Sequence, residues 1–536
     1  MLSSVSLCVR PLGIALTVLC ASLFIRKNAK RRAYNALPSP PSALPLLGST
    51  LDLMLYHRHR HHDWISEQSS HFHGKPWRLD LLGAPPMIVL GTVKGFEDVQ
   101  STQSHIFEKG SRMIEIFRDV FGDGMIAVDH SHWAFQRKSL AHMFNMDVFS
   151  RVLMKILQTH TLALGSILRS AARTPEKSLN EGVDIDKLLQ RWAFDVFTEF
   201  VFEIPTDSLA SQQDHPIMSA LDEASKCTAA RFSQPDWAWK LMRFLNIGSE
   251  KILRQNIAIL NGEARKITTE ALEKNKREMD ENPSSKQKTA LSLMVQQEIL
   301  QSGKEEDRIK VTPTYFRDVS ITLLMAGKDT VALALTWFIV MLNRNPHVEE
   351  NIRMELRREL PDLFIKEEFV PNETHIRSLV YLDATIRESL RLHPPAPFNW
   401  REANDDTTLS DGTFVAKGTL VCTPPYTIGR MEHVWGLDVL KCKPERWLEV
   451  DPSDTSKQKI RDVSPFQFNA FLGGPRRCLG YLLAMAQMKI LMAYLLSKYH
   501  LQTTEDPHSY TYSLAMTSSF DKPVLVNVFR NQPPTL

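Results

Sequence analysis

The chain has 536 residues, 43% of them hydrophobic, and its 64 basic and 61 acidic side chains leave a formal charge of +3. This composition suffices for a large core, and the near-neutral balance argues against a dedicated nucleic-acid-binding protein. The six cysteines, at positions 8, 20, 227, 422, 442 and 478, form no Cys-x-x-Cys pairs, which excludes a disulfide framework or a zinc ribbon and suits a reducing compartment.

The N-terminal segment predicts a membrane anchor. The run from Leu12 to Ile25 is apolar apart from two hydroxyl residues, and it reaches the length of a spanning helix if it starts at Leu2. Five basic residues follow between positions 26 and 32, and such a cluster stays on the cytoplasmic side of a membrane. A cleaved signal peptide is the alternative, but there the charges precede the apolar run. We therefore expect an anchor at residues 1–25 and a cytosolic body.

A hinge follows the anchor. Residues 37–48 are rich in proline, which stiffens the chain and prevents helix formation. The expected organisation is an anchor at 1–25, a basic and proline-rich hinge at 26–48, and one body at 49–536.

The body is expected to be mostly helical, with a small hairpin of strands at 77–82 and 86–90. A helix from about His132 places Trp133 and Arg137 four residues apart on one face. A longer helix opens at Thr312-Pro313, where a capping residue precedes proline at the first helical position, and runs to about residue 345.

The middle of this long helix reads Ala326-Gly-Lys-Asp-Thr330. The charged pair excludes a membrane span, because neither apolar flank alone is long enough. Gly327 lowers the helix propensity, and the Thr330 hydroxyl can bond back to a carbonyl and bend the helix. Two charges, a glycine and a threonine inside an apolar helix indicate a chemical role.

Another helix is predicted near residues 381–392, where His393-Pro-Pro ends it. It carries Glu388 and Arg391, three residues apart, which would form an ordinary surface salt bridge if the helix were exposed. Arg446 follows in the segment Pro444-Glu-Arg-Trp447.

The most informative stretch is Phe471 to Gly480, in which five positions follow the pattern Phe-x-x-Gly-x-Arg-x-Cys-x-Gly. The glycines, including Gly474, permit a tight turn and close approach of a flat partner. A helix predicted from about Leu479 adds positive potential at its N-terminus, which favours the thiolate of Cys478. A buried structural cysteine is the alternative, but the five matched positions together disfavour it.

This stretch resembles the haem-binding loop of the cytochrome P-450 family, the haem-thiolate monooxygenases, at all five positions. The resemblance implies a mainly α fold: a single helical domain with small β-sheets that encloses a b-type haem. Cys478 matches the proximal iron ligand. The implied haem contacts are Trp133, Arg137, Arg401, Phe471, Gly474, Arg476 and Gly480. Some fatty-acid hydroxylases of the family carry a glutamate that esterifies the haem; Ala326 replaces it, so we expect non-covalent haem.

The resemblance also assigns catalytic, structural and pocket residues. Thr330 would hold water near the iron, and Asp329 would relay protons to it; the following Val331 departs from the usual threonine or serine. A buried network that supports the cysteine loop would consist of Glu388, Arg391 and Arg446. The substrate-pocket candidates are Ala326, Ala396, Phe398 and Met516.

The implied reaction inserts one oxygen atom of O2 into a lipophilic substrate. Gly429–Gly436 and Phe121–Gly124 look like the branch that hydroxylates fatty acids or alkanes at or near the chain end. No dinucleotide-binding Gly-x-Gly-x-x-Gly follows a predicted strand, so a separate NADPH-dependent flavoprotein reductase, with cytochrome b5 as an optional second donor, would supply electrons at the endoplasmic reticulum membrane. The alternatives are a sterol or xenobiotic monooxygenase, a hydroperoxide-rearranging isomerase, which the Asp329–Thr330 pair disfavours, and a non-enzymatic haem-binding protein.

Overall fold

The computed structural model describes residues 30–141, 144, 152–172, 182–202, 204–232, 234–281, 313–513 and 515–531. The expected anchor at 1–25, the basic residues Arg26 and Lys27 and the capping residue Thr312 lie outside these ranges. Within them the chain is mainly helical with four small sheets, as expected.

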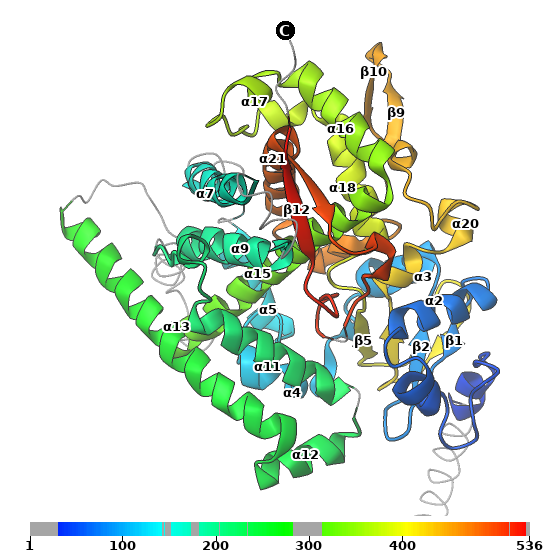
Figure 1. Cartoon of the computed structure of the whole chain (residues 1–536). Helices are drawn as coiled ribbons and strands as arrows, with labels where there is room; N and C mark the ends of the chain where they lie inside the picture. The colour runs from blue at the N-terminus through cyan, green and yellow to red at the C-terminus, as the bar shows by residue number, and fades with distance from the viewer. Residues whose placement is uncertain are drawn as a thin grey trace, which may run out of the picture.

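One long helix, α15 (Pro313–Arg344), passes through the middle of the molecule (Figure 1). It packs most extensively against α9 (Ile185–Phe202), and also against α13 (Gly248–Glu281), α18 (Val380–Leu392) and α21 (Tyr481–Lys498). Among the described residues, only the stretch Thr314–Arg344 is long and apolar enough to cross a membrane, and 83% of its most apolar window is buried inside the protein. A helix that is apolar all round and buried by its neighbours is a core helix.

The remaining helices surround this centre (Figure 1). They are α2 (His61–His71), α3 (Val93–Glu97), α4 (Gly110–Phe121), α5 (His130–Ala141), α7 (Met154–Ala172), α10 (Ser208–Ser211), α11 (Pro216–Phe232), α12 (Asp236–Leu245), α16 (Pro346–Glu359), α17 (Asp362–Ile365), α19 (Pro425–Ile428) and α20 (Glu432–Trp435). Short π or 3-10 turns are η1 (Asp52–Tyr56), η2 (Asp98–Thr102), η5 (His375–Arg377), η6 (Pro444–Trp447), η7 (Asn469–Phe471), η8 (Gly474–Arg476) and η9 (Pro507–Ser509).

The largest sheet joins the two halves of the chain. Its order is β1 (Trp77–Arg78), β2 (Met87–Val89), β8 (Leu420–Cys422), β5 (Trp400–Ala403), β3 (Phe107–Glu108), and only the β2–β8 pair is parallel. A three-stranded sheet has the order β11 (Tyr499–Thr503), β12 (Leu525–Arg530), β4 (Val183–Asp184). The two remaining sheets are the pairs β6 (Thr407–Thr408)–β7 (Phe414–Val415) and β9 (Leu448–Asp451)–β10 (Asp454–Ile460). The expected hairpin is confirmed as β1–β2, with shorter strands than predicted.

The close packing of α9 on α15 explains the glycine in the middle of α15. A Cβ atom at Gly327 would overlap the ring of Phe197, which projects from α9. Gly327 therefore allows the two helices to approach, a packing role that the sequence interpretation did not foresee.

Candidate functional site

The Phe471–Gly480 loop is held in one conformation by its glycines and by a polar clamp. Gly474 has a φ of +61°, and a Cβ atom there would overlap the carbonyl oxygen of Gln100. The buried side chain of Gln100 accepts a 2.7 Å hydrogen bond from the Gly473 N–H and exchanges hydrogen bonds with the side chain of Asn469. Only glycine fits this crowded turn, so the loop has little freedom to move.

The cysteine occupies the end of this loop, just before α21. The Cys478 N–H donates to the carbonyl oxygen of Phe471 at 2.9 Å, and the Phe471 ring packs edge-on against Tyr481. Surrounding protein raises the pKa of the Cys478 thiol, whereas the Gly480 N–H and the guanidinium of Arg137 lower it. Cys478 is nevertheless exposed in the structure.

Cationic side chains gather beside the loop around Asp129. Asp129 forms an ion pair with Arg476 and accepts a 3.0 Å hydrogen bond from the backbone of Lys109. The Arg476 guanidinium lies 4.3 Å from the ring centroid of Trp133, a cation–π distance. Arg137, on the same helix as Trp133, donates to the Arg477 carbonyl at 2.8 Å.

Two further cations are buried in this cluster. Burial and the charge of Arg476 lower the pKa of Arg401 to about 10, and the same effects, together with Arg401, hold the pKa of Lys109 well below its usual value. Lys109 Nζ donates to the Met125 carbonyl at 2.8 Å. The three cations, Lys109, Arg401 and Arg476, outnumber the two carboxylates that act on them, Asp129 and Glu108, and such a cluster is suited to a further anion.

A face of α15 is accessible in an otherwise buried stretch. Ala326 is exposed and Thr330, one turn later, is half-buried, whereas the residues on both sides of the pair are buried. The Thr330 hydroxyl donates to the Ala326 carbonyl at 2.6 Å, the back-bond expected from the sequence. Asp329 is buried and turns to Lys328, at 2.7 Å, whose ammonium also contacts Asp222 of α11 at 2.6 Å.

The pocket candidates come from three converging segments. Ala396 is exposed between two buried prolines, and Phe398 is half-buried with its ring edge-on to Trp400. The turn that contains the half-buried Met516 is tied to the first of these segments, because the Ser518 N–H donates to the Pro395 carbonyl at 2.9 Å. The indole of Trp337 donates to the Ser518 carbonyl at 3.0 Å, which places the Trp337 end of α15 beside this turn.

These features fit a haem. A flat apolar group with two carboxylates and a metal needs apolar walls, cations and one soft ligand. The accessible face at Ala326 and Thr330 supplies a wall, the cluster of Lys109, Arg401 and Arg476 supplies the cations, and the accessible sulfur of Cys478 supplies the ligand.

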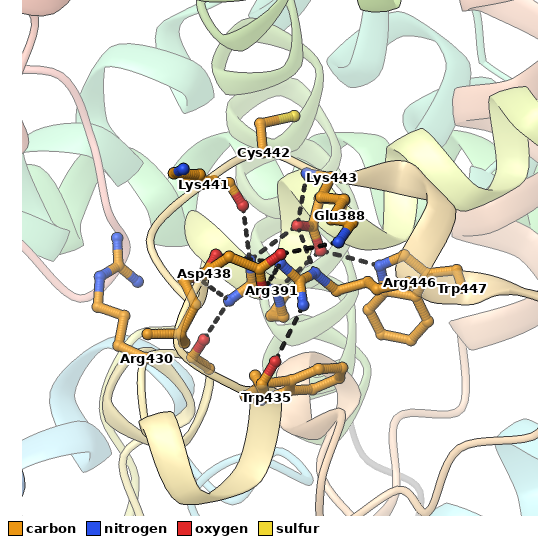
Figure 2. A network of polar contacts seen from close by, with 12 residues as sticks. Glu388, Arg391, Arg430, Trp435, Asp438, Lys441, Cys442, Lys443, Arg446 and Trp447 are labelled. Carbon is orange, nitrogen blue, oxygen red and sulfur yellow. Dashed lines mark hydrogen bonds and ion pairs between the residues drawn. The ribbon is translucent and has the colours of Figure 1, made fainter.

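The structure joins Glu388, Arg391 and Arg446 in one buried network. Figure 2 shows the loop between Trp435 and Lys443 wrapped around Arg391. Both arginines bind the Glu388 carboxylate at 2.8 Å, and the Trp447 indole donates to it at 2.9 Å. Arg391 also donates to the Val439 carbonyl at 2.7 Å. An ordinary surface pair is therefore the wrong description, since Glu388 has no exposed surface.

Several residues of the site carried no sequence signal. Lys109, Asp129 and Gln100 lie in segments without a recognisable motif, and Asp222 is one of two adjacent acids in α11, with Glu223. Their positions depend on contacts far along the chain, such as Gln100 with Gly473 and Asp222 with Lys328. The only local hint was the buried charge at Lys328 inside an apolar run.

Comparisons with known proteins agree with this geometry. A family model described as cytochrome P-450 matches residues 38–522. The chain is 31% identical over 468 residues to cytochrome P-450 94A1 of Vicia sativa, covering 87% of this chain and 85% of that protein. It is 32% identical over 471 residues to cytochrome P-450 94B1 of Arabidopsis thaliana, covering 87% of each. Cytochrome P-450 86B1 of Arabidopsis thaliana is 29% identical over 523 residues, covering 94% of this chain and 88% of the relative.

Proposed function

Since the chain belongs to the cytochrome P-450 family and is therefore a haem-thiolate monooxygenase, we propose that it hydroxylates fatty acids or alkanes at or near the end of the chain. The observation that carries the site assignment is the accessible sulfur of Cys478 on a clamped loop beside three cations. The substrate class is supported by the apolar pocket candidates and by the sequence phrases Gly429–Gly436 and Phe121–Gly124.

The bound haem would supply a thiolate-ligated iron at which O2 is reduced, so that one oxygen atom enters the substrate and the other leaves as water. Cys478 would bind the iron, with the Gly480 N–H and Arg137 stabilising the thiolate. The haem carboxylates would be neutralised by the cations beside Asp129 and Glu108, because these two carboxylates do not balance three positive charges. These cations are Lys109, Arg401 and Arg476.

Protons would reach the site through α15. Thr330 lies on the accessible face and would hold a water molecule there, because a hydroxyl can donate to one partner while it accepts from another. Asp329, the next residue, would exchange protons with that water. Ala326 has no carboxylate with which to form an ester, so the haem would be bound without a covalent link.

A reductase would dock on the side of Cys478. Lys138, Lys441, Lys443 and Arg477 are exposed cations on the segments that carry or flank the cysteine loop and its supporting network. Such a basic surface favours encounter with an acidic partner. We propose an NADPH-dependent flavoprotein as the electron donor, with cytochrome b5 as an optional second donor.

The chain would be held at the endoplasmic reticulum membrane by residues 1–25 and by an apolar face of the body. This apolar face consists of Leu46, Leu82, Trp237, Leu241, Phe244 and Leu245, all of which are exposed. Gly83 lies against Pro235 at the start of α12, and Gly48 bridges to Leu81, so these segments adjoin one another at the lower end of Figure 1. An exposed apolar area next to a membrane anchor favours contact with lipid.

The decisive experiment uses membranes that contain this protein and a flavoprotein reductase. NADPH and a series of saturated fatty acids from dodecanoic to octadecanoic acid are added, and new hydroxyl groups are located by mass spectrometry. Products hydroxylated near the methyl end support the proposal. A normal thiolate-type CO spectrum without any lipid product would contradict the substrate class and direct the search to sterols and foreign compounds.

The ligand assignment has a separate test. Replacing Cys478 with alanine should abolish the thiolate-type spectrum of the ferrous CO complex. Cys442→Ala is the matched control, since this half-buried thiol contacts Met341 Sδ and lies outside the loop. A normal spectrum in Cys478→Ala would overturn the assignment.

A further inference from the structure

Lys328 is a fully enclosed cation held between two carboxylates. Its side chain has 0% exposed surface, and its ammonium lies 2.6 Å from Asp222 Oδ1 and 2.7 Å from Asp329 Oδ1. Asp222 is the more accessible of the two, with 28% of its side chain exposed against 11% for Asp329. On α9, Asp186 also feels the charge of Lys328 and is hydrogen-bonded to Thr336.

The packing of the helices makes this ion pair unusual. α11, which carries Asp222, packs mainly against α13 and α4, whereas α15 packs mainly against α9. The Lys328–Asp222 contact therefore links two helices that otherwise scarcely meet. Apolar side chains of similar volume usually stabilise such a position at least as well as a buried ion pair does, so stability alone does not explain a lysine here.

Lys328 and Asp222 have opposite effects on Asp329, the acid next to Thr330. Burial raises the pKa of Asp329, the ammonium of Lys328 lowers it, and the negative charge of Asp222 raises it again. Without Lys328, Asp329 would be a buried carboxyl group that favours the neutral form. Without Asp222, the Lys328 ammonium would bind Asp329 alone. The Asp329 carboxylate would then leave its ion pair with Lys328 less readily.

We propose that Lys328 and Asp222 are positioning residues of the proton relay: Lys328 favours the ionised form of Asp329, Asp222 limits that effect so that Asp329 can still exchange protons, and the ion pairs tie Asp329 to α11. The inference rests on the proposed role of Asp329 and Thr330. Asp329 takes up each proton from bulk water and becomes a carboxylate again when it passes that proton on. No further reactant is therefore needed. Lys328 keeps its own proton throughout.

The test compares four variants in the full-length protein with its reductase. Lys328→Met removes the charge at similar volume, Asp222→Asn removes the outer carboxylate, and Lys328→Arg keeps the cation. The control is Glu250→Gln, which breaks a buried ion pair between α13 and Arg231 of α11 without touching α15. Dodecanoic acid is the probe lipid, and the readouts are the share of NADPH electrons recovered as hydrogen peroxide, the solvent isotope effect on NADPH oxidation, and the haem content.

Lys328→Met and Asp222→Asn should release roughly tenfold more peroxide relative to water than the wild type, less than the roughly 10²–10⁴-fold that a positioned acid contributes, because Asp329 itself is kept. Their solvent isotope effects should rise while the CO spectrum stays normal. Lys328→Arg should return peroxide release most of the way to the wild-type level. Glu250→Gln should lose stability without changing peroxide release or the solvent isotope effect. Wild-type peroxide release and isotope effect in both Lys328→Met and Asp222→Asn would overturn the inference.

Thr330→Ala separates this inference from the proposed function. If Thr330→Ala releases peroxide and the two ion-pair variants do not, only the role of Lys328 and Asp222 fails. If Thr330→Ala releases no more peroxide than the wild type, the assignment of Asp329 and Thr330 as the proton relay is wrong. The inference that rests on this assignment then fails as well.

Discussion

Next to the cysteine loop, three cations lie near two carboxylates, Asp129 and Glu108; the cations are Lys109, Arg401 and Arg476. Two of these cations are buried, and burial lowers the pKa of both. Such groups remain charged more readily when an anion is added to the cluster. At the scale of single residues, the site is therefore prepared for an anionic ligand before the ligand arrives.

Replacing Lys109 with methionine should weaken haem binding while the fold remains intact. A hydrogen bond to a charged group contributes about 1.5–3 kcal/mol, which corresponds to roughly a tenfold to hundredfold loss of affinity. The measurement is the rate and extent of haem transfer to a scavenging apoprotein. The matched control is Lys94→Met, an exposed lysine paired with Glu97, and an equal loss of haem from that variant would contradict the role of Lys109.

The sequence predicted only part of this site. Cys478, Arg476 and Trp133 belong to recognisable spacings, and the structure gathers the loop and α5 through the Arg476–Trp133 contact. Lys109 could not be predicted, because a single lysine after a two-residue strand has no pattern of its own. Its significance comes from Arg401, almost 300 positions away in the chain, which approaches it only in the folded sheet.

At the scale of elements, the contact between α9 and α15 depends on Gly327. The missing side chain lets the Phe197 ring rest on the backbone of α15, directly beside the segment that carries Asp329 and Thr330. A larger residue would force the helices apart or push Phe197 from its rotamer.

Gly327→Ala should destabilise the protein by about 1–3 kcal/mol, the usual cost of overpacking a core. Gly262→Ala is the control, because this glycine is also helical but has open space around it, and alanine there should stabilise by up to roughly 1 kcal/mol. Chemical denaturation of the two variants checks the opposite signs. A neutral or stabilising Gly327→Ala would show that α9 does not pack on α15 as described.

The network around Glu388 fastens α18 to the loop that precedes the cysteine segment. Burial alone would raise the pKa of Glu388, but Arg391 and Arg446 lower it below the ordinary value of 4.5. The folded state therefore favours the ionised carboxylate. Its contribution to stability is complete above pH 4.5 and is lost as the pH falls through the lower folded-state pKa.

Glu388→Gln should lower the free energy of unfolding by about 3–5 kcal/mol at neutral pH, because it leaves two buried arginines without their carboxylate. The difference from the wild type should shrink on acidification below pH 4.5. Denaturation at neutral and acidic pH measures both effects. Glu350→Gln, in an exposed pair with Arg357, should change stability by less than about 1 kcal/mol; equal effects of the two variants would contradict the network.

For the whole molecule, α12 and the turns near Leu46 and Leu82 form the apolar face proposed to meet lipid. Phe244 is 84% exposed and Trp237 is 69% exposed, values that are unusual for large apolar side chains in water. We expect Trp237 to lie within the lipid when the full-length protein is placed in vesicles.

Brominated lipids, which quench nearby tryptophan fluorescence, test this expectation. Trp237→Phe should remove a large part of the quenching, whereas Trp192→Phe should leave it unchanged because Trp192 is completely buried. Equal quenching in the wild type and Trp237→Phe would show that the apolar face does not contact the bilayer.

The overall architecture was predicted better than its details. The helices predicted from about residue 132, over 313–345 and near 381–392 were confirmed as α5, α15 and α18, and prolines mark the start of α15 and follow the end of α18. The five-stranded sheet could not be predicted, because its strands have only two to four residues and their partners lie in distant parts of the chain. Periodicity within a strand of that length carries almost no information.

The parallel pairing of β2 with β8 has a consequence for biosynthesis. Met87 pairs with Leu420, so the edge of β2 that does not face β1 has no partner until most of the chain has left the ribosome. The same holds for Gln100, which waits for Gly473. Unpaired strand edges promote association between chains. We expect the nascent protein to depend on chaperones throughout elongation, and prematurely terminated chains to be degraded without ever acquiring a partly folded, haem-binding form.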